Sequence, residues 1–492
     1  MTPEHFDVII VGSGLSGIDA AYHVRTYCPG RSYVILESRD AIGGTWDLFR
    51  YPGIRSDSDM YTFGYSFRPW QSNAAIADGE SIRAYIRDTA EAYGIDRNIR
   101  FRHRVARASW SSEDALWTIE TERGEAAEPV RLTCNFLFCC TGYYDYASGY
   151  TPEFAGIDRF RGTLVHPQAW PETLDYAGKR VVVIGSGATA VTIIPAVAAT
   201  AAHVTMLQRS PTYIVSRPSQ DAIAKWLRSH LPVRLAYALA RWYNVLFGIY
   251  FYNLSRRRPQ AVKDWIVKQA QLLLGADYDV KTHFTPRYNP WDQRLCLAPD
   301  ADFFRAIRSG KADVVTDRIA TFTASGIRLQ SGRELPADII VTATGLRLKL
   351  LGGIQVAVDG KPVEFSQTIN FKGVMFSDVP NLAAAFGYTN ASWTLKCDLT
   401  CAYVARLLNY MDRRGYASCT PRQRDPALVA EPLIDFSSGY IQRSIDQFPR
   451  QGSRKPWRLY QNYVRDLVSL RYGPVSDKAL EFSRRQPAKA AA

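Results

Sequence analysis

Two stretches of the chain show the same succession of apolar and small residues. Each begins with a run of apolar residues typical of a buried strand, passes through a glycine-rich turn and enters a segment with helical apolar spacing. The first occupies residues 6–37 and the second residues 179–210. A repeated strand–turn–helix–strand order predicts an α/β fold with two Rossmann-like dinucleotide-binding domains.

The first glycine-rich turn contains Gly12, Gly14 and Gly17. Glycines let the backbone turn tightly and approach a pyrophosphate, which then lies on the helix N-terminus. Glu37 ends the next strand, where a carboxylate accepts hydrogen bonds from ribose hydroxyls. The turn, the helix and the terminal acid together predict a dinucleotide site, which we assign to FAD.

A second glycine pair follows at residues 43–44. In flavoproteins with two dinucleotides, such a pair lets the chain pass close to FAD, although the same residues also fit an ordinary turn. The FAD contacts predicted in this segment are Gly44, Thr45 and Trp46.

The second glycine-rich turn contains Gly185, Gly187 and Ala190. The residue that ends the next strand here is Arg209, at nearly the same offset as Glu37 in the first unit. A guanidinium at this position suits the 2′-phosphate of NADPH, whereas an acid suits the 2′-hydroxyl of NADH. A surface charge at a strand end is the plainer alternative, but the matching offsets favour NADPH.

The order of these units predicts a discontinuous FAD domain. Apolar runs ending in Thr-Gly at 136–142 and 338–345 are interpreted as strands that leave and re-enter it around an inserted NADPH domain. The predicted division assigns 1–145 to the first part of the FAD domain, 146–212 and 286–335 to the NADPH domain, 213–285 to a helical insert, and 336–492 to the second part of the FAD domain with a C-terminal extension.

The helical insert is basic and aromatic. Residues 242–255 are uncharged and follow Arg241, and residues 256–258 are three arginines. The stretch is too short to span a bilayer. Two interpretations remain and are compatible: a cap over the substrate cleft, or a peripheral contact with an anionic membrane on its cytoplasmic side.

Composition narrows the remaining possibilities. The net charge is +13, yet no interleaved aromatic and basic groove indicates nucleic acid. The eight cysteines show neither a disulfide framework nor metal spacing, and no redox CxxC pair lies in the chain, which argues against a disulfide reductase. The N-terminus lacks a signal-peptide pattern, so we expect a cytoplasmic protein.

The segment between the two units, which we expect to be a linker between the domains, carries the most specific motif. Residues 160–171 fit F-x-G-x-x-x-H-x-x-x-W-P at every fixed position. This is the fingerprint of type I Baeyer–Villiger monooxygenases, which are class B flavoproteins. The segments 44–59, 288–296 and 387–396 also resemble the actinobacterial ethionamide-activating monooxygenases. The fingerprint residues are Phe160, Gly162, His166 and Trp170.

The resemblance implies a reaction. NADPH reduces FAD, O2 adds at the flavin C4a atom, and the peroxyflavin attacks a ketone carbonyl to give an ester or lactone; sulfides and thioamides are expected second substrates. Arg294 matches the active-site arginine of the family, and Asp57 matches the acid that orients it. A guanidinium keeps its charge in a dry site and suits an anion there.

Two further implications of the resemblance concern NADPH and the fingerprint. Many relatives carry a lysine directly before the active-site arginine, where this chain has Gln293. Arg209 then carries more of the 2′-phosphate selection. We expect His166 to couple the domains rather than to transfer a proton in the chemical step.

Two other functions remain open. One is a flavin-containing heteroatom monooxygenase that acts on sulfur or nitrogen, against which Trp170 and Arg294 argue. The other is a redox-sensing or membrane-docking flavoprotein that binds both cofactors without oxygenating a substrate. For the favoured interpretation the partners are O2 and a lipophilic small-molecule ketone or sulfur compound.

Overall fold

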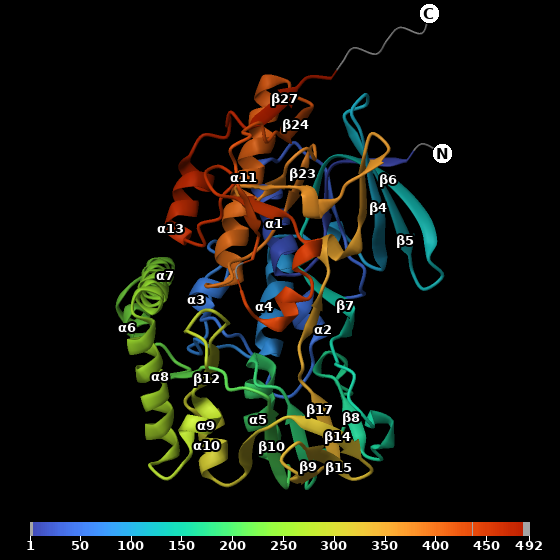
Figure 1. The fold of residues 1–492 in the computed structure, drawn as a ribbon. Helices are drawn as coiled ribbons and strands as arrows, with labels where there is room; N and C mark the ends of the chain where they lie inside the picture. The colour runs from blue at the N-terminus through green and yellow to red at the C-terminus, as the bar shows by residue number, and fades with distance from the viewer. Residues whose placement is uncertain (1–2, 435, 486–492) are drawn as a thin grey trace, which may run out of the picture.

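The computed structural model describes residues 3–434 and 436–485, which form two sheet-centred halves and a layer of helices along one side (Figure 1). The larger half contains a nine-stranded sheet in the order β20-β19-β4-β5-β6-β1-β2-β3, with β23 paired to β6. Its strands are β1 (Glu4–Val11), β2 (Tyr33–Leu36), β3 (Ile99–Arg100), β4 (His103–Ser111), β5 (Leu116–Arg123), β6 (Glu128–Cys139), β19 (Gln355–Val358), β20 (Lys361–Pro362) and β23 (Leu382–Ala384).

The centre of this sheet is parallel and buried on both faces. β1 pairs in parallel with β2 and β6, and Ile9 and Ile10 are fully buried on its two faces. Burial on both faces explains the continuous apolar run in the sequence. The helices of this half are α1 (Leu15–Tyr27), α2 (Thr45–Leu48), α3 (Met60–Phe63), α4 (Gly79–Ala92) and α11 (Trp393–Arg414).

The smaller half contains a five-stranded parallel sheet in the order β13-β10-β9-β17-β8. Its strands are β8 (Thr163–Val165), β9 (Arg180–Ile184), β10 (His203–Gln208), β13 (Ala312–Thr316) and β17 (Ile339–Thr342). Its helices are α5 (Ala188–Ala198) and α10 (Asp302–Arg308), and a small antiparallel sheet adds β14 (Ile319–Thr323), β15 (Gly326–Leu329) and β16 (Glu334–Pro336).

Two connecting strands join the halves. β7 (Tyr144–Gly149) leaves the larger half, β18 (Leu346–Leu348) returns to it, and the two pair with each other in antiparallel fashion. The chain therefore crosses between the halves through one two-stranded connector. This arrangement makes the larger half discontinuous.

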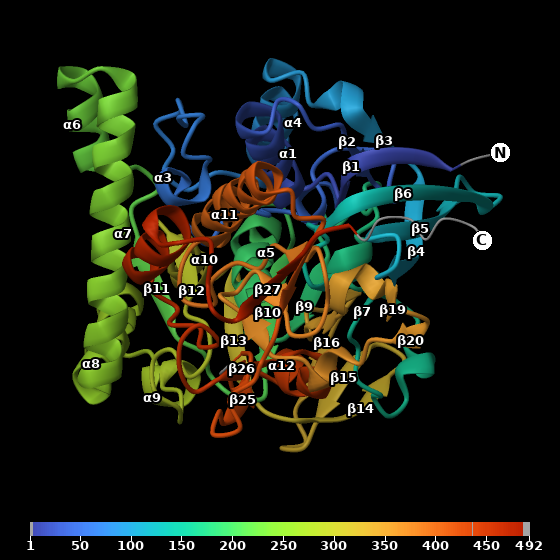
Figure 2. The ribbon, with the colours of Figure 1, turned by 90° about the horizontal axis from the view of Figure 1, so that it is seen from above.

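The helical layer follows β10 and lies at the edge of the molecule (Figure 2). Its elements are β11 (Ile214–Arg217), α6 (Ala222–His230), α7 (Val233–Arg257), α8 (Pro259–Leu274), α9 (Val280–Phe284) and β12 (Cys296–Pro299). The guanidinium of Arg241 anchors α7 to the larger half, because its Nη1 donates to the carbonyls of Tyr61 and Gly64 at 2.9 and 2.7 Å. Among the described residues, no helix combines the length and apolarity that a bilayer crossing requires.

The C-terminal part packs against α11 and α7. Its elements are β21 (Asn370–Phe371), β22 (Met375–Phe376), β24 (Ser418–Pro421), β25 (Ala430–Pro432), α12 (Gly439–Gln442), β26 (Arg450–Gly452), α13 (Tyr463–Asp466), the π-helix η7 (Leu467–Tyr472) and β27 (Leu480–Ser483). Trp242 of α7 contacts Tyr463 of α13 edge-on, with ring centroids 5.7 Å apart.

Two details differ from the sequence-based expectations. Strand β17, which the sequence assigned to a re-entry into the FAD domain, pairs with β9 and β8 of the five-stranded sheet. The chain leaves that sheet after Thr342, so the boundary predicted at residue 336 is wrong. The fingerprint is likewise more than a linker, because Thr163–Val165 form the edge strand β8 of the same sheet.

Candidate active site

The first glycine-rich turn is tightly packed against its own helix. Gly12 has a φ of +101°, and a Cβ on Gly17 would lie 1.8 Å from the carbonyl oxygen of Gly12. Only glycine fits at Gly17, because the start of α1 presses directly on the turn. Gly12 and Gly14 line the cavity beside the turn, whereas the role of Gly17 is this close approach.

Glu37 is buried and holds the turn in place. Its Oε2 accepts hydrogen bonds from the backbone N–H and the hydroxyl of Ser13, at 2.7 and 2.9 Å. Its Oε1 accepts from the N–H of Arg39 at 2.9 Å. Glu37 thus stabilises the turn while it also lines the cavity, where an oxygen acceptor suits a ribose.

The segment after β2 closes over the first turn. Gly44 has a φ of +56°, and a Cβ there would lie 3.0 Å from the Cα of Gly14. The Thr45 hydroxyl lies 3.0 Å from the hydroxyl of Tyr146, and Trp46 packs edge-on against Phe63. The two glycine segments therefore approach each other too closely for side chains.

These residues enclose a cavity of about 490 Å³. Its lining extends from Glu37 through Gly14 and Gly44 to Asp57 and Arg294. Backbone glycines beside a helix N-terminus suit a pyrophosphate, and a buried carboxylate suits a ribose. The first cradle therefore fits an FAD whose flavin end lies toward Arg294.

The second glycine-rich turn is tightly packed at Gly185 but open at Gly187. Gly185 has a φ of +131°, and a Cβ there would lie 2.3 Å from the carbonyl of Ala343. At Gly187, the N-cap of α5, a Cβ would meet no atom within 4 Å. Ala190 is fully buried in the helix, and Arg209 is exposed at the end of β10. This cradle fits a dinucleotide with a 2′-phosphate.

Arg294 and Asp57 lie where two cavities meet. Both residues line the first cavity and also a second one of about 430 Å³. The Nε of Arg294 lies 3.9 Å from Oδ2 of Asp57, and the Arg294 side chain keeps 40% of its surface, which faces the cavities. The structure thus places a permanent cation between the flavin end of the first cradle and a second chamber.

The charges of this pair influence each other. Burial raises the pKa of the Asp57 carboxyl above its usual range, and the attraction of Arg294 only partly offsets that rise. Burial also opposes the charge of Arg294, yet its pKa is raised because Asp57, Tyr143 and Tyr440 favour the cation. Arg294 therefore stays positive at every physiological pH, whereas burial opposes the negative charge of Asp57.

The second cavity is mostly apolar, and the helical insert forms part of its wall. Its walls include Val245, Phe247 and Phe251 of α7, with Trp291 on the loop that carries Arg294. The segment 389–392, before α11, forms the opposite wall. The charged residues of the lining are Asp57, Asp59, Arg217 and Arg294. A mostly apolar chamber with few charged groups suits an organic substrate with a single polar group.

Three of the fingerprint residues, Phe160, Gly162 and Trp170, lie in the five-stranded half. A Cβ on Gly162 would lie 2.4 Å from the carbonyl of Asp338, so this glycine allows β8 to approach β17. Phe160 packs on the apolar cluster beside the small antiparallel sheet, and Trp170 lies in the core of the five-stranded half.

His166 bridges the connector. Its Nε2 donates to the carbonyl of Gly345 at 3.2 Å, and its Nδ1 accepts the N–H of Gln168 at 3.1 Å. The ring also packs against Gly149, where a Cβ would lie 1.9 Å away. Burial lowers the pKa of His166, which favours the neutral ring. His166 thus contacts β7 and the residue that precedes β18, and it lines neither cavity.

Several residues of the site were not predicted from the sequence. Tyr143 and Tyr440 act on the charge of Arg294 from separate segments. Phe247 and Phe251 were predicted only as part of the insert. Their spacing with Tyr243 was an available signal, because side chains four residues apart share one helix face; here the rings of 243 and 247, and of 247 and 251, stack.

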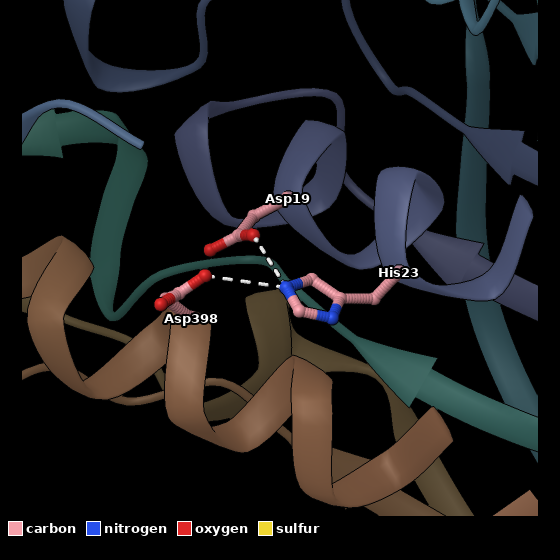
Figure 3. A group of neighbouring side chains, drawn as sticks. All are labelled: Asp19, His23 and Asp398. Carbon is pink, nitrogen blue, oxygen red and sulfur yellow. Dashed lines mark hydrogen bonds and ion pairs between the residues drawn. The ribbon is translucent and has the colours of Figure 1, made fainter. Parts of the chain in front are cut away.

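A buried polar cluster lies beneath the first cradle, between α1 and α11 (Figure 3). His23 Nε2 lies 3.5 Å from Asp19 Oδ1 and 3.2 Å from Asp398 Oδ1. These residue types could hold a metal ion. Burial, together with the charge of Asp398, raises the pKa of Asp19 well above its usual range, which favours its neutral acid. A neutral acid suits a hydrogen-bonded contact between the two helices better than a cation site.

The comparisons with known proteins agree on one family. Residues 7–348 match the model of the family described as flavin-binding monooxygenase-like. The chain is 54% identical to the FAD-containing monooxygenase EthA of Mycobacterium tuberculosis over 98% of both chains. A structure described as oxidised steroid monooxygenase bound to NADP superposes with a TM-score of 0.75 at 23% identity, covering 98% of this chain and 100% of that one.

A second solved structure shares the fold. The cyclohexanone monooxygenase with bound ε-caprolactone superposes with a TM-score of 0.76 at 18% identity, and covers 98% of this chain and 100% of that one. The predicted α/β class with two dinucleotide-type halves is confirmed by these superpositions. The resemblance to ethionamide-activating monooxygenases, inferred from motifs, is confirmed as well.

Proposed function

Because the chain belongs to the flavin-binding monooxygenase-like family, we propose that it is a Baeyer–Villiger monooxygenase that converts lipophilic ketones into esters or lactones. The cofactors are FAD and NADPH. The observation that carries the proposal is the position of Arg294 and Asp57, which line the FAD cavity and the apolar cavity at once.

We assign each sheet to one cofactor. The nine-stranded half holds FAD through Gly12, Gly14, Glu37 and Gly44, and the five-stranded half holds NADPH through Gly185, Gly187 and Arg209. The first part of the FAD domain then ends in the connector strand β7, and the chain re-enters the FAD domain after Thr342. The division keeps the helical insert at 213–285 as a separate unit.

Bound FAD, once reduced by NADPH, supplies the activation of O2. Arg294 supplies a fixed cation beside the flavin end of the cavity, and its charge cannot be lost by deprotonation. Asp57 limits the directions that the guanidinium takes. Removal of one such preorganised group typically lowers a rate by about 10²–10³.

The walls of the second cavity select the substrate. Phe247, Phe251 and Trp291 exclude water from the chamber and bind an apolar body. The guanidinium of Arg294 then donates to the carbonyl oxygen of a ketone. The other arginine of the lining is Arg217, which lies against Phe247. A ketone with a long apolar part satisfies both features.

His166 is proposed to position the two cofactors relative to each other. It donates to Gly345 on one connecting segment and packs against Gly149 on the other. Transfer from NADPH, and later access of a substrate to the same flavin face, require the halves to adjust at this connector. The neutral ring keeps this contact across the physiological pH range.

Sulfides and thioamides are proposed as second substrates of the same chamber. A sulfur lone pair attacks an electrophilic oxygen, so its oxidation gains less from a fixed cation than attack on a carbonyl does. Loss of Arg294 should therefore reduce ester formation more than sulfoxide formation.

Product analysis tests the proposal. The holoenzyme is supplied with NADPH and O2 together with an aryl-alkyl ketone or, separately, an aryl sulfide. Ester formation from the ketone supports the Baeyer–Villiger assignment. Sulfoxide without ester would replace it with a heteroatom monooxygenase, and NADPH consumption with hydrogen peroxide as the only product from both would identify a non-oxygenating flavoprotein.

A further inference from the structure

The outer surface of the helical insert carries an unusual collection of exposed apolar side chains. Twelve of the eighteen exposed large apolar residues among those that the structure describes lie on α6, α7 and α8. They are Ile223, Trp226, Val233, Leu235, Leu239, Trp242, Tyr243, Leu246, Phe247, Tyr250, Trp265 and Leu272. We call this surface the outer face. Isolated exposed apolar residues are common, but a concentration of this kind marks an interaction site.

The outer face continues onto the C-terminal part. Val464, Val468 and Tyr472 of α13 and η7 are also exposed, and the contact between Trp242 and Tyr463 joins these elements to α7. Viewed from above, α6, α7 and α8 form one column at the edge of the molecule, with α13 beside α7 (Figure 2). The apolar residues therefore lie on one side of the protein rather than around it.

Exposed basic side chains lie on the same helices as this apolar surface. The segment 215–268 carries ten basic residues and two acidic ones. Of the two acids, Asp221 caps α6 and accepts from Asn244, so its charge is engaged inside the layer. Arg234 and Arg257 are exposed and form no ion pair among the described residues. Aromatic and aliphatic side chains mixed with cations match the composition of interfacial membrane-binding helices.

The second cavity opens toward the same surface. Phe247 and Trp265 line the cavity and are also exposed on the outer face. Arg217 at the rim lies over the ring of Phe247, with 5.1 Å between the guanidinium carbon and the ring centroid. A molecule that leaves an apolar phase at this face thus meets the rim of the substrate chamber first.

We propose that the outer face docks the protein on the surface of an anionic lipid bilayer, with α7 lying in the interface. Anionic lipid is the occupant that the charges favour, because a second copy of the chain would bring two basic faces together. The apolar residues enter the headgroup region and the arginines contact lipid phosphates. Delivery of lipophilic substrates through the rim of the cavity would extend the proposed function and rests on it. Docking on the bilayer does not depend on the proposed function.

Vesicle flotation tests docking without turnover. The full-length holoenzyme is mixed with vesicles of phosphatidylglycerol and phosphatidylcholine, or of phosphatidylcholine alone. We expect at least tenfold stronger partitioning into the anionic vesicles, weakened by high salt because exposed charges are screened. Equal and negligible partitioning into both would overturn the proposal.

Matched variants distinguish vesicle binding through the outer face from nonspecific binding through exposed apolar residues elsewhere. Leu239→Gln, Leu246→Gln and Tyr250→Gln change three exposed residues outside both cavities, of which Leu246 and Tyr250 are 54% and 63% exposed. Tyr27→Gln, Leu164→Gln and Val429→Gln make the same kind of change at exposed positions elsewhere. The first triple variant should lose about tenfold or more in partitioning, and the second should keep it.

Two further measurements complete the design. Arg234→Gln with Arg257→Gln should also lower anionic binding by about tenfold, since each charge near a lipid surface contributes appreciably. Flavin content and far-UV circular dichroism of every variant report folding. If the first triple variant binds vesicles as well as the control does, or changes only the oligomeric state, the outer face is not a lipid surface and the proposal fails.

Discussion

The two glycine-rich cradles share one sequence pattern but differ in enclosure. Around the first, Gly17 presses on Gly12, Gly44 covers Gly14, and Glu37 is buried and hydrogen-bonded to the turn. Around the second, Gly185 is closely packed against Ala343 as well, but Gly187 faces open space and Arg209 is exposed. The pattern specifies a place for a dinucleotide, whereas the packing around it decides how firmly that dinucleotide is held. The contrast fits a resident FAD and an NADPH that binds and leaves.

The largest expected effect comes from a methyl group added at Gly17, compared with a methyl group added at the open position Gly187. Gly17→Ala places a Cβ 1.8 Å from a backbone oxygen, so we expect destabilisation of about 3 kcal/mol or more and loss of bound FAD. Gly187→Ala meets no atom within 4 Å and should keep both the fold and FAD while weakening NADPH binding. Thermal unfolding and flavin absorbance measure both. Equal stability of the two variants would contradict the contrast.

The next effect concerns the charge at the end of the second cradle. Arg209→Ala should raise the KM for NADPH about 10- to 100-fold, since a hydrogen bond to a charged group contributes roughly 1.5–3 kcal/mol. The KM for NADH should stay unchanged, and Arg413→Ala, at an exposed position in the last turn of α11 in the other half, serves as control. An equal rise in the KM for NADPH and in the KM for NADH would mean that Arg209 does not contact the 2′-phosphate.

A smaller effect is expected where the two halves are joined. His166→Ala removes the hydrogen bond to Gly345 and should lower kcat about fivefold, because one net hydrogen bond contributes about 1 kcal/mol. FAD content and the KM for NADPH should not change. His166→Gln, which restores a donor, should recover part of kcat. A bell-shaped pH profile that disappears in the variant would instead indicate proton transfer by His166.

The smallest effect concerns stability at the junction of the cavities. The folded-state pKa of Asp57 is raised above its unfolded value, so this group favours folding at low pH and loses that contribution as pH rises through the raised pKa. Asp57→Asn should therefore have the higher melting temperature at neutral pH, with the difference shrinking as the pH falls. A lower melting temperature for Asp57→Asn at neutral pH would show that Arg294 holds the carboxylate more strongly than its burial opposes it.

Local patterns in the sequence predicted much of this molecule. Gly12, Gly185 and the acid or arginine that follows them lie within single strand–turn–helix units, so spacing alone locates both cradles. The apolar run before Gly345 was assigned to the wrong sheet, because a strand buried on both faces has the same pattern whichever partner it pairs with.

Long-range features were less predictable. The cluster of Asp19, His23 and Asp398 joins helices that are distant in the sequence, and nothing local at Asp19 indicates that contact. The tyrosines that act on Arg294 come from separate segments for the same reason. The insert was predicted to be helical, but which of its side chains face the cavity and which face outward depended on how Arg241 anchors α7.

The most direct test of the central claim is the amount of ester formed per NADPH consumed by Arg294→Met. Arg294 lies where the FAD cavity meets the substrate cavity, so its loss should leave FAD binding and NADPH oxidation largely intact. The account predicts that the ester yield per NADPH falls by about 10²-fold or more, with hydrogen peroxide released instead, while Arg413→Met, at an exposed position in the last turn of α11, keeps the wild-type yield. A wild-type ester yield from Arg294→Met would contradict it.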